Sequence, residues 1–102
     1  MNETERQYIK ISDNLMILRF DIMLYDPDIG DPKEIKRLQV FDTQLNTCTE
    51  EDFIALLSYF NQNPNFLYEI HEMKNVRKML FSDWIKANKI GWYQKYRLLI
   101  PE

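Results

Sequence analysis

The chain has 102 residues, of which 45% are hydrophobic and 14% aromatic, and its formal net charge is −3. This length and apolar content suit one core-forming domain over residues 1–102 and exclude a disordered chain. The acidic balance excludes a polycation built to bind nucleic acid over its whole surface. No apolar stretch approaches the roughly 18 residues of a membrane-spanning helix, and the charged first residues do not resemble a signal peptide.

Cysteine usage indicates the compartment. Cys48 is the only cysteine, so neither an intrachain disulfide nor a cysteine zinc set can form. We therefore expect a cytoplasmic protein. The chain also has only two glycines and is rich in Ile, Asn, Lys and Tyr, which is typical of an AT-rich genome. We expect its source to be a microbe, a phage or a mobile element.

The first half predicts strands. Between Leu15 and Tyr25, apolar residues alternate with a more polar set, and this period of two predicts a strand with an inward face of Leu18, Phe20, Ile22 and Leu24. Residues 7–11 form a shorter strand before it, joined through a hairpin connection at 12–14. After a turn at 26–32, residues 34–43 form a third strand. Short connections favour an antiparallel meander.

The second half predicts helices. Thr49 precedes three acids and a helical stripe through Phe53 and Phe60, so we expect a helix from Thr49 to about Asn61. Residues 66–71 fit either a strand or a helix, and we favour a helix. A second stripe predicts a helix that ends at Gly91 as its cap, and its members are Met73, Val76, Leu80, Trp84 and Ala87. The expected fold is α+β, with a three-stranded antiparallel meander packed against two or three C-terminal helices.

The inventory of reactive side chains is short. The chain holds one histidine, His71, and one cysteine, Cys48. A Cys/His pair brought together in space remains an alternative, because such pairs need not be adjacent in sequence. We favour structural roles for both residues. No glycine-rich phosphate loop occurs, because the two glycines lie far apart. We predict that the protein is not an enzyme and has no cofactor.

The acidic turn has some features of a calcium site. Asp26, Asp28 and Asp31 surround Gly30, and alternating carboxylates can converge on calcium. The order of Gly30 and Asp31 and the flanking prolines depart from the EF-hand pattern, so we favour a solvated turn and predict no metal.

Charge is distributed unevenly along the chain. Residues 1–70 carry six basic and thirteen acidic side chains, whereas residues 71–101 carry seven basic and two acidic ones. The predicted acidic patch consists of Asp26, Asp28, Asp31 and Glu34. The predicted basic and aromatic patch consists of Lys74, Arg77, Lys78, Trp92, Tyr93, Lys95, Tyr96 and Arg97.

These patches predict function through contact with a large partner. We expect a non-catalytic protein-binding module, an inhibitor or immunity-type protein that meets its partner by charge complementarity. We expect the partner of such a module to be a nucleic-acid-processing enzyme or a toxin. The alternative is a nucleic-acid-binding domain that uses the basic and aromatic segment. Two further alternatives stay open: Trp92 and Tyr96 complete the core, and exposed edge strands pair two copies into a homodimer. We expect no membrane partner.

Overall fold

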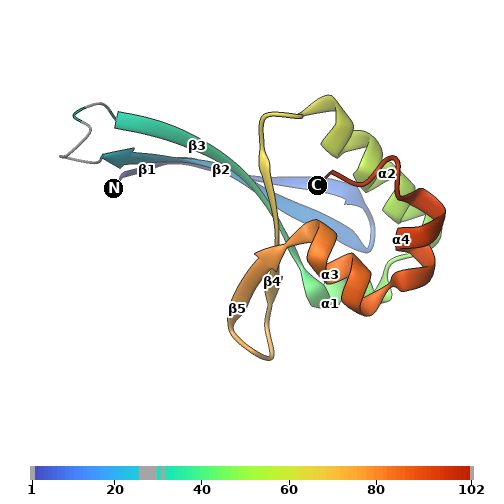
Figure 1. Cartoon of the computed structure of the whole chain (residues 1–102). Coiled ribbons are helices and arrows are strands. Elements are labelled where there is room, and N and C mark those ends of the chain that lie inside the picture. Colours follow the sequence, from blue (N-terminus) through green and yellow to red (C-terminus); the bar gives the residue numbers. More distant parts are fainter. Residues whose placement is uncertain (1, 26–29, 31, 102) are drawn as a thin grey trace.

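The structure is a computed structural model that describes residues 2–25, 30 and 32–101. Its elements follow one another from the N-terminus to the C-terminus (Figure 1). They are β1 (Asn2–Ser12), β2 (Leu15–Tyr25), β3 (Pro32–Phe41), α1 (Asp42–Thr47), α2 (Glu50–Gln62), β4 (Leu67–Glu72), β5 (Arg77–Leu80), α3 (Phe81–Asn88) and α4 (Ile90–Tyr96). The α+β class predicted from the sequence is confirmed.

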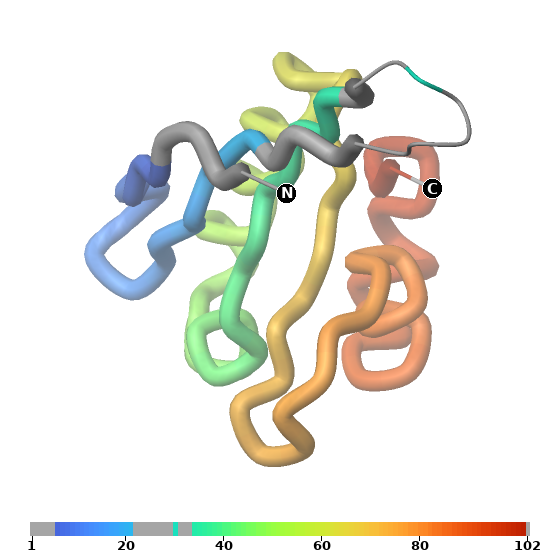
Figure 2. The backbone as a smooth tube through the Cα atoms, turned by 90° about the vertical axis from the view of Figure 1, so that its left-hand side faces the viewer, coloured from blue at the N-terminus to red at the C-terminus, as the bar shows by residue number. Residues whose placement is uncertain are grey.

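The strands form one five-stranded sheet in the order β1-β2-β3-β4-β5. The predicted antiparallel meander is present as β1, β2 and β3. It is only part of the sheet, because β4 joins β3 in parallel and β5 pairs with β4 in antiparallel. Figure 2 shows α2, α3 and α4 behind the strands. Among the described residues no helix covers the other face, which we call the open face.

The face that β2 turns toward the helices differs from the prediction. Leu15 and Ile17 belong to the main core, and the guanidinium of Arg19 on the same face lies 4.7 Å from the Phe66 ring. Leu18 and Phe20 instead form a separate small cluster on the open face. They are nevertheless 7% and 5% exposed, since cross-strand neighbours such as the Arg6 guanidinium, 5.9 Å from the Phe20 ring, lie over them.

Helix α2 forms where the sequence predicts it. Thr49 is the N-cap: its hydroxyl accepts from the Asp52 N–H and its own N–H donates to the Asp52 carboxylate, each at 3.2 Å. This capping box satisfies backbone donors that the first turn leaves free. The inward stripe is buried completely or nearly so and consists of Phe53, Leu56, Leu57 and Phe60.

For residues 66–71 the favoured helix is wrong, and the alternative, a strand, is what the structure shows. Leu67–Glu72 is strand β4, with Tyr68 and Ile70 in the core on alternate positions. A parallel neighbour needs a long crossover connection, and α1 and α2 supply it between β3 and β4. The local pattern fits both a strand and a helix, and the pairing of Val40 with Ile70 across this crossover selects the strand.

The long second helix is also wrong. Met73 and Val76 lie in a turn at 55% and 80% exposure, and Leu80 ends β5. The real helix, α3, starts at Phe81 and buries Trp84 and Ile85.

Gly91 does not cap α3. That helix ends at Asn88, and Gly91 lies within α4. The stretch from Met73 to Ala87 therefore combines a turn, a strand and a helix whose apolar residues share helical spacing by coincidence.

In the described part of the chain, none of the helices has the length and apolar character that crossing a membrane requires.

Candidate functional site

The predicted basic and aromatic patch divides into two groups in the structure. Lys74, Arg77 and Lys78 lie on the hairpin formed by β4 and β5. The remaining members lie on or beside α4, and they are Trp92, Tyr93, Lys95, Tyr96 and Arg97. The two groups have different surroundings.

The α4 group is largely used by the fold. The Trp92 ring stacks on Phe53 at 4.6 Å between centroids. The Tyr96 hydroxyl donates to Glu50 Oε1 at 2.6 Å, and Lys95 Nζ lies 2.7 Å from the same oxygen. These two donors hold the pKa of the Glu50 carboxyl below its usual range. The expectation that Trp92 and Tyr96 complete the core describes this group best.

The hairpin group is presented to solvent. Glu72 of β4 pairs with Arg77 of β5, so four residues, Met73 to Val76, form the loop between them. The hairpin projects past the end of α1 in Figure 1. Its loop exposes two apolar side chains, Met73 and Val76, and a cation, Lys74.

Polar contacts connect the hairpin loop to its own base and to α1. The Glu72 carboxylate, whose side chain is 9% exposed, accepts from Arg77 Nε and, at 3.2 Å, from Asn75 Nδ2. Arg77 and then Asn75 hold the pKa of this carboxyl below its usual range. The Met73 N–H donates to Asp42 Oδ1 at 3.2 Å, which ties the loop to the start of α1. The loop is therefore fixed on both sides.

Val76 is in a conformation that valine rarely adopts. Its φ is 48°, and in the described part of the chain no other non-glycine residue has a positive φ. A β-branched side chain in the left-handed region costs about 1–3 kcal/mol, and it persists only where the surroundings impose it. Because Val76 is 80% exposed, burial within the fold does not offset this cost.

The charge around the loop has one sign. Residues 73–78 hold three cations and no acid, namely Lys74, Arg77 and Lys78. Arg77 is bound to Glu72, whereas neither Lys74 nor Lys78 pairs with an acid among the residues described here. This end of the hairpin therefore combines the apolar side chains of Met73 and Val76 with the ammonium groups of Lys74 and Lys78.

The open face continues from the hairpin. Lys78 pairs in register with His71, whose ring lies 5.4 Å from the Phe41 ring. Further along the same face, Gln39 Nε2 donates to Glu69 Oε2 at 3.0 Å, and Arg37 Nε lies 3.9 Å from Glu69 Oε1. The Arg37 Nε is buried and has no hydrogen-bond partner.

Most of the predicted acidic patch lies outside the described residues. Asp26, Asp28 and Asp31 lie outside the described residues. Glu34 is exposed on β3, ahead of the point where β4 begins to pair at Arg37. It lines an open depression of about 550 Å³ with Asn65 and Phe66. Glu34 and the loop of the hairpin therefore lie beyond opposite ends of β4.

Cys48 and His71 do not converge. Cys48 is in the core, where burial and then the charge of Asp52 raise the pKa of its thiol to about 11. His71 points to the opposite side of the sheet from Ile70, a core neighbour of Cys48. No group of three or more His, Cys, Asp or Glu side chains in the described ranges is placed to hold a metal ion.

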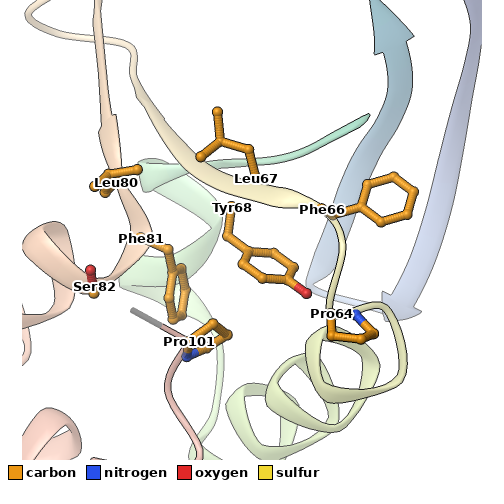
Figure 3. A pocket seen from close by; sticks show the side chains of 8 residues that line it. All are labelled: Pro64, Phe66, Leu67, Tyr68, Leu80, Phe81, Ser82 and Pro101. Carbon is orange, nitrogen blue, oxygen red and sulfur yellow. The ribbon is translucent and has the colours of Figure 1, made fainter. Parts of the chain in front are cut away.

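A partly enclosed depression lies away from the hairpin loop, near the start of β4. It has a volume of about 200 Å³, and its lining is Pro64, Phe66, Leu67, Tyr68, Leu80, Phe81, Ser82 and Pro101 (Figure 3). The Tyr68 hydroxyl donates to the Phe60 carbonyl at 2.7 Å. Apart from the Ser82 and Tyr68 hydroxyls its side chains are apolar, so the depression offers shape rather than acid–base chemistry.

Sequence reasoning found the cations of the hairpin but missed its apolar tip. Met73 and Val76 were counted as core residues of a helix. The signal that could have found the turn is Lys74-Asn75, two polar residues between alternating segments. The pair of Arg37 and Glu69 carries no such signal, since it depends on the parallel pairing of β3 with β4.

Comparison with family models, with curated proteins and with solved structures finds no match to this chain in any of the three.

Proposed function

We propose that the protein is a non-catalytic protein-binding module whose recognition element is the tip of the hairpin formed by β4 and β5. The tip is defined here as Met73, Lys74, Val76 and Lys78. It enters an apolar depression on the partner, and its two lysines meet acidic side chains at the rim.

The observation that carries this proposal is the exposed Val76 at positive φ. An apolar side chain held in strain and in solvent lowers the stability of the free protein. Burial of that side chain against a partner recovers about 1.5–3 kcal/mol. Strain of this kind supports a functional role for the residue that carries it.

Rigidity supports the same proposal. The contacts of Glu72 with Arg77 and Asn75, and of Met73 with Asp42, order the loop before binding. A loop that is already ordered has little conformational entropy left to lose on association, and this increases affinity. Such a hairpin suits an inhibitor or an immunity-type protein, the class that we expect from the sequence.

The partner's chemistry follows from the tip. An apolar pair flanked by ammonium groups is complementary to an apolar cleft with carboxylates at its edge. Single-stranded nucleic acid is a poorer fit, because its bases are commonly bound by stacking on exposed aromatic rings. The hairpin loop and β5 contain no aromatic residue, and Trp92 and Tyr96 already pack on Phe53.

Affinity capture with matched variants tests the proposal. The bait is the full chain as wild type, Val76→Asn, or the control Ile90→Asn, which replaces another exposed β-branched residue. The source is nuclease-treated lysate from cells that express the gene. We expect wild type and Ile90→Asn to retain the same stoichiometric protein and Val76→Asn to lose most of it. Equal retention by Val76→Asn, or capture of nucleic acid alone from an untreated lysate, would refute the proposal.

A further inference from the structure

The open face of the sheet is continuous from β1 to β5. Along β3, Arg37, Gln39 and Phe41 alternate with the core residues Leu38 and Val40, so their side chains lie on the open face. Residues paired directly across two strands share a face. The strand pairings therefore extend this surface over the whole sheet, on the side toward the viewer in Figure 2.

The pairings arrange the side chains of the open face in three rows that cross the strands. The pairing of β1 with β2 is regular from Arg6 to Lys10, and the third row lies one residue beyond the pair of Ile17 with Val40. The rows are Arg6, Phe20, Arg37 and Leu67; then Tyr8, Leu18, Gln39, Glu69 and Leu80; then Lys10, Met16, Phe41, His71 and Lys78.

Two of these rows present aromatic rings. Tyr8 is 64% exposed. Phe41 and His71 are half-buried neighbours, with ring centroids 5.4 Å apart and planes inclined by 30°. Tyr8 and Phe41 lie on strands that are two spacings, or about 10 Å, apart. The face therefore offers two separate places where a flat ring can stack.

The charge of the open face is opposite in sign to that of the chain. The only acid in the three rows is Glu69, which accepts from Gln39 Nε2 at 3.0 Å and lies 3.9 Å from Arg37 Nε. The cations in the rows are Arg6, Lys10, Arg37 and Lys78. Lys10 pairs with Asp13 at 3.0 Å, but both side chains are well exposed and such a pair contributes little. The face is thus positive, whereas the whole chain has a net charge of −3, and it is complementary to a polyanion.

We infer that the open face binds single-stranded nucleic acid, with bases stacked on Tyr8 and on the ring pair of Phe41 and His71 and with phosphates beside the cations of the three rows. Unpaired bases stack on exposed aromatic side chains, and a positive surface attracts their backbone. DNA and RNA share this chemistry. An acidic peptide matches the cations but makes no use of the rings, and a duplex hides the faces of its bases. This activity goes beyond the proposed function, whose tip shares only Lys78 with the open face.

Fluorescence anisotropy of short labelled oligonucleotides, with the full chain as titrant, tests the inference. We expect single-stranded DNA or RNA to bind more tightly than a duplex of the same sequence, with an affinity that falls as salt is added. Tyr8→Ala should weaken binding about tenfold, because it removes one stacking ring. Gln7→Ala is the control and keeps the wild-type affinity, since Gln7 pairs with Arg19 on the helix side of the sheet.

The cations have their own matched pair of variants. Lys10→Gln should weaken binding and lower its salt dependence. Lys36→Gln should do neither, because Lys36 is exposed on the opposite face of β3. No binding by wild type, equal affinity of Tyr8→Ala, or equal affinity for duplex contradicts the inference. Displacement of the oligonucleotide by oligoglutamate as readily as by unlabelled oligonucleotide would also overturn it in favour of an acidic protein.

A second measurement covers a Tyr8→Ala variant that fails to fold. Amide NMR shifts of the wild type are followed as the single-stranded oligonucleotide is added. Changes centred on Tyr8, Phe41 and His71 support the inference, and changes confined to α4 or to the hairpin loop refute it. Val76→Asn should bind the oligonucleotide as wild type does, so this inference and the proposed function can fail independently.

Discussion

At Val76, one residue combines three properties that separately have ordinary explanations. It is β-branched, it has a φ of 48° and it is 80% exposed. A turn position at positive φ is normally occupied by glycine or asparagine, which adopt it at little cost. Valine therefore lowers the stability of the hairpin. Under the proposed function, it occupies this position because its side chain contacts the partner.

This assignment predicts opposite effects of one substitution on stability and on binding. Val76→Asn keeps the turn and relieves the strain, so the free energy of unfolding should rise by about 1 kcal/mol. Binding to the partner should weaken at the same time, because the apolar side chain is gone. Urea denaturation measures the first effect. A variant less stable than wild type would show that the valine is a structural requirement of the loop.

Glu72 gives a prediction about pH. Its pKa is lowered in the folded protein, first by the hydrogen bond from Arg77. The carboxylate therefore stabilises the fold above the usual carboxyl pKa of about 4.3, and this contribution is lost as the pH falls through its lower folded-state value. Glu50 behaves in the same way through Lys95 and Tyr96.

Urea midpoints measured between neutral pH and about pH 3 test this linkage. We expect Glu72→Gln to be less stable than wild type at neutral pH and to lose less stability on acidification. Glu34→Gln is the control, since Glu34 is exposed on β3 and far from the hairpin. If the urea midpoint of Glu72→Gln falls with pH as steeply as that of the wild type, the Glu72–Arg77 contact does not stabilise the fold.

At the scale of elements, the sequence predicted α2 and β2 correctly, because contacts and patterns within each segment determine its conformation. The capping box at Thr49 and the stripe from Phe53 to Phe60 lie within one helix, and the predicted helix matches α2. The alternation from Leu15 to Tyr25 likewise predicted β2. The face of β2 was not predictable in this way, because Leu18 and Phe20 are covered by side chains from other strands.

The capping box makes a prediction at this scale. Thr49→Ala removes the acceptor for the Asp52 N–H and should lower the free energy of unfolding by about 1 kcal/mol. Thr47→Ala is the matched control, because the Thr47 hydroxyl donates to the Thr43 and Gln44 carbonyls within α1. Chemical denaturation of both variants measures the difference. Equal loss in the two would show that the capping box contributes nothing specific.

Strand β4 and the hairpin show why the rest was missed. The strand exists because Ile70 pairs beside Val40 after a crossover through two helices. A sequence window that holds residues 66–71 does not contain this partner. When residues 66–71 are taken as a helix, Met73 and Val76 fit the apolar stripe of a helix that follows. They are then expected to be buried, and their exposure is missed.

At the scale of the whole molecule, the sheet separates two kinds of surface. On one side the helices and the aromatic side chains of α4 complete the core around Phe53. On the other side the open face leads to the hairpin formed by β4 and β5 (Figures 1 and 2). This hairpin carries Lys74 and Lys78 together with the exposed apolar residues Met73 and Val76. The charge asymmetry in the sequence predicted an interaction surface in the second half of the chain. In the structure, the residues of the predicted basic and aromatic patch lie in two places, on or beside α4 and on the hairpin.

Site-specific photo-crosslinking in cells that express the gene tests most directly whether the hairpin tip contacts a partner protein. A photoreactive phenylalanine analogue replaces Val76 in one variant and Asp83, an exposed residue of α3, in the other. The proposed function predicts a discrete protein adduct from position 76 that resists nuclease and is absent from position 83. An adduct from position 83 alone, or a nuclease-sensitive adduct from position 76, would contradict it.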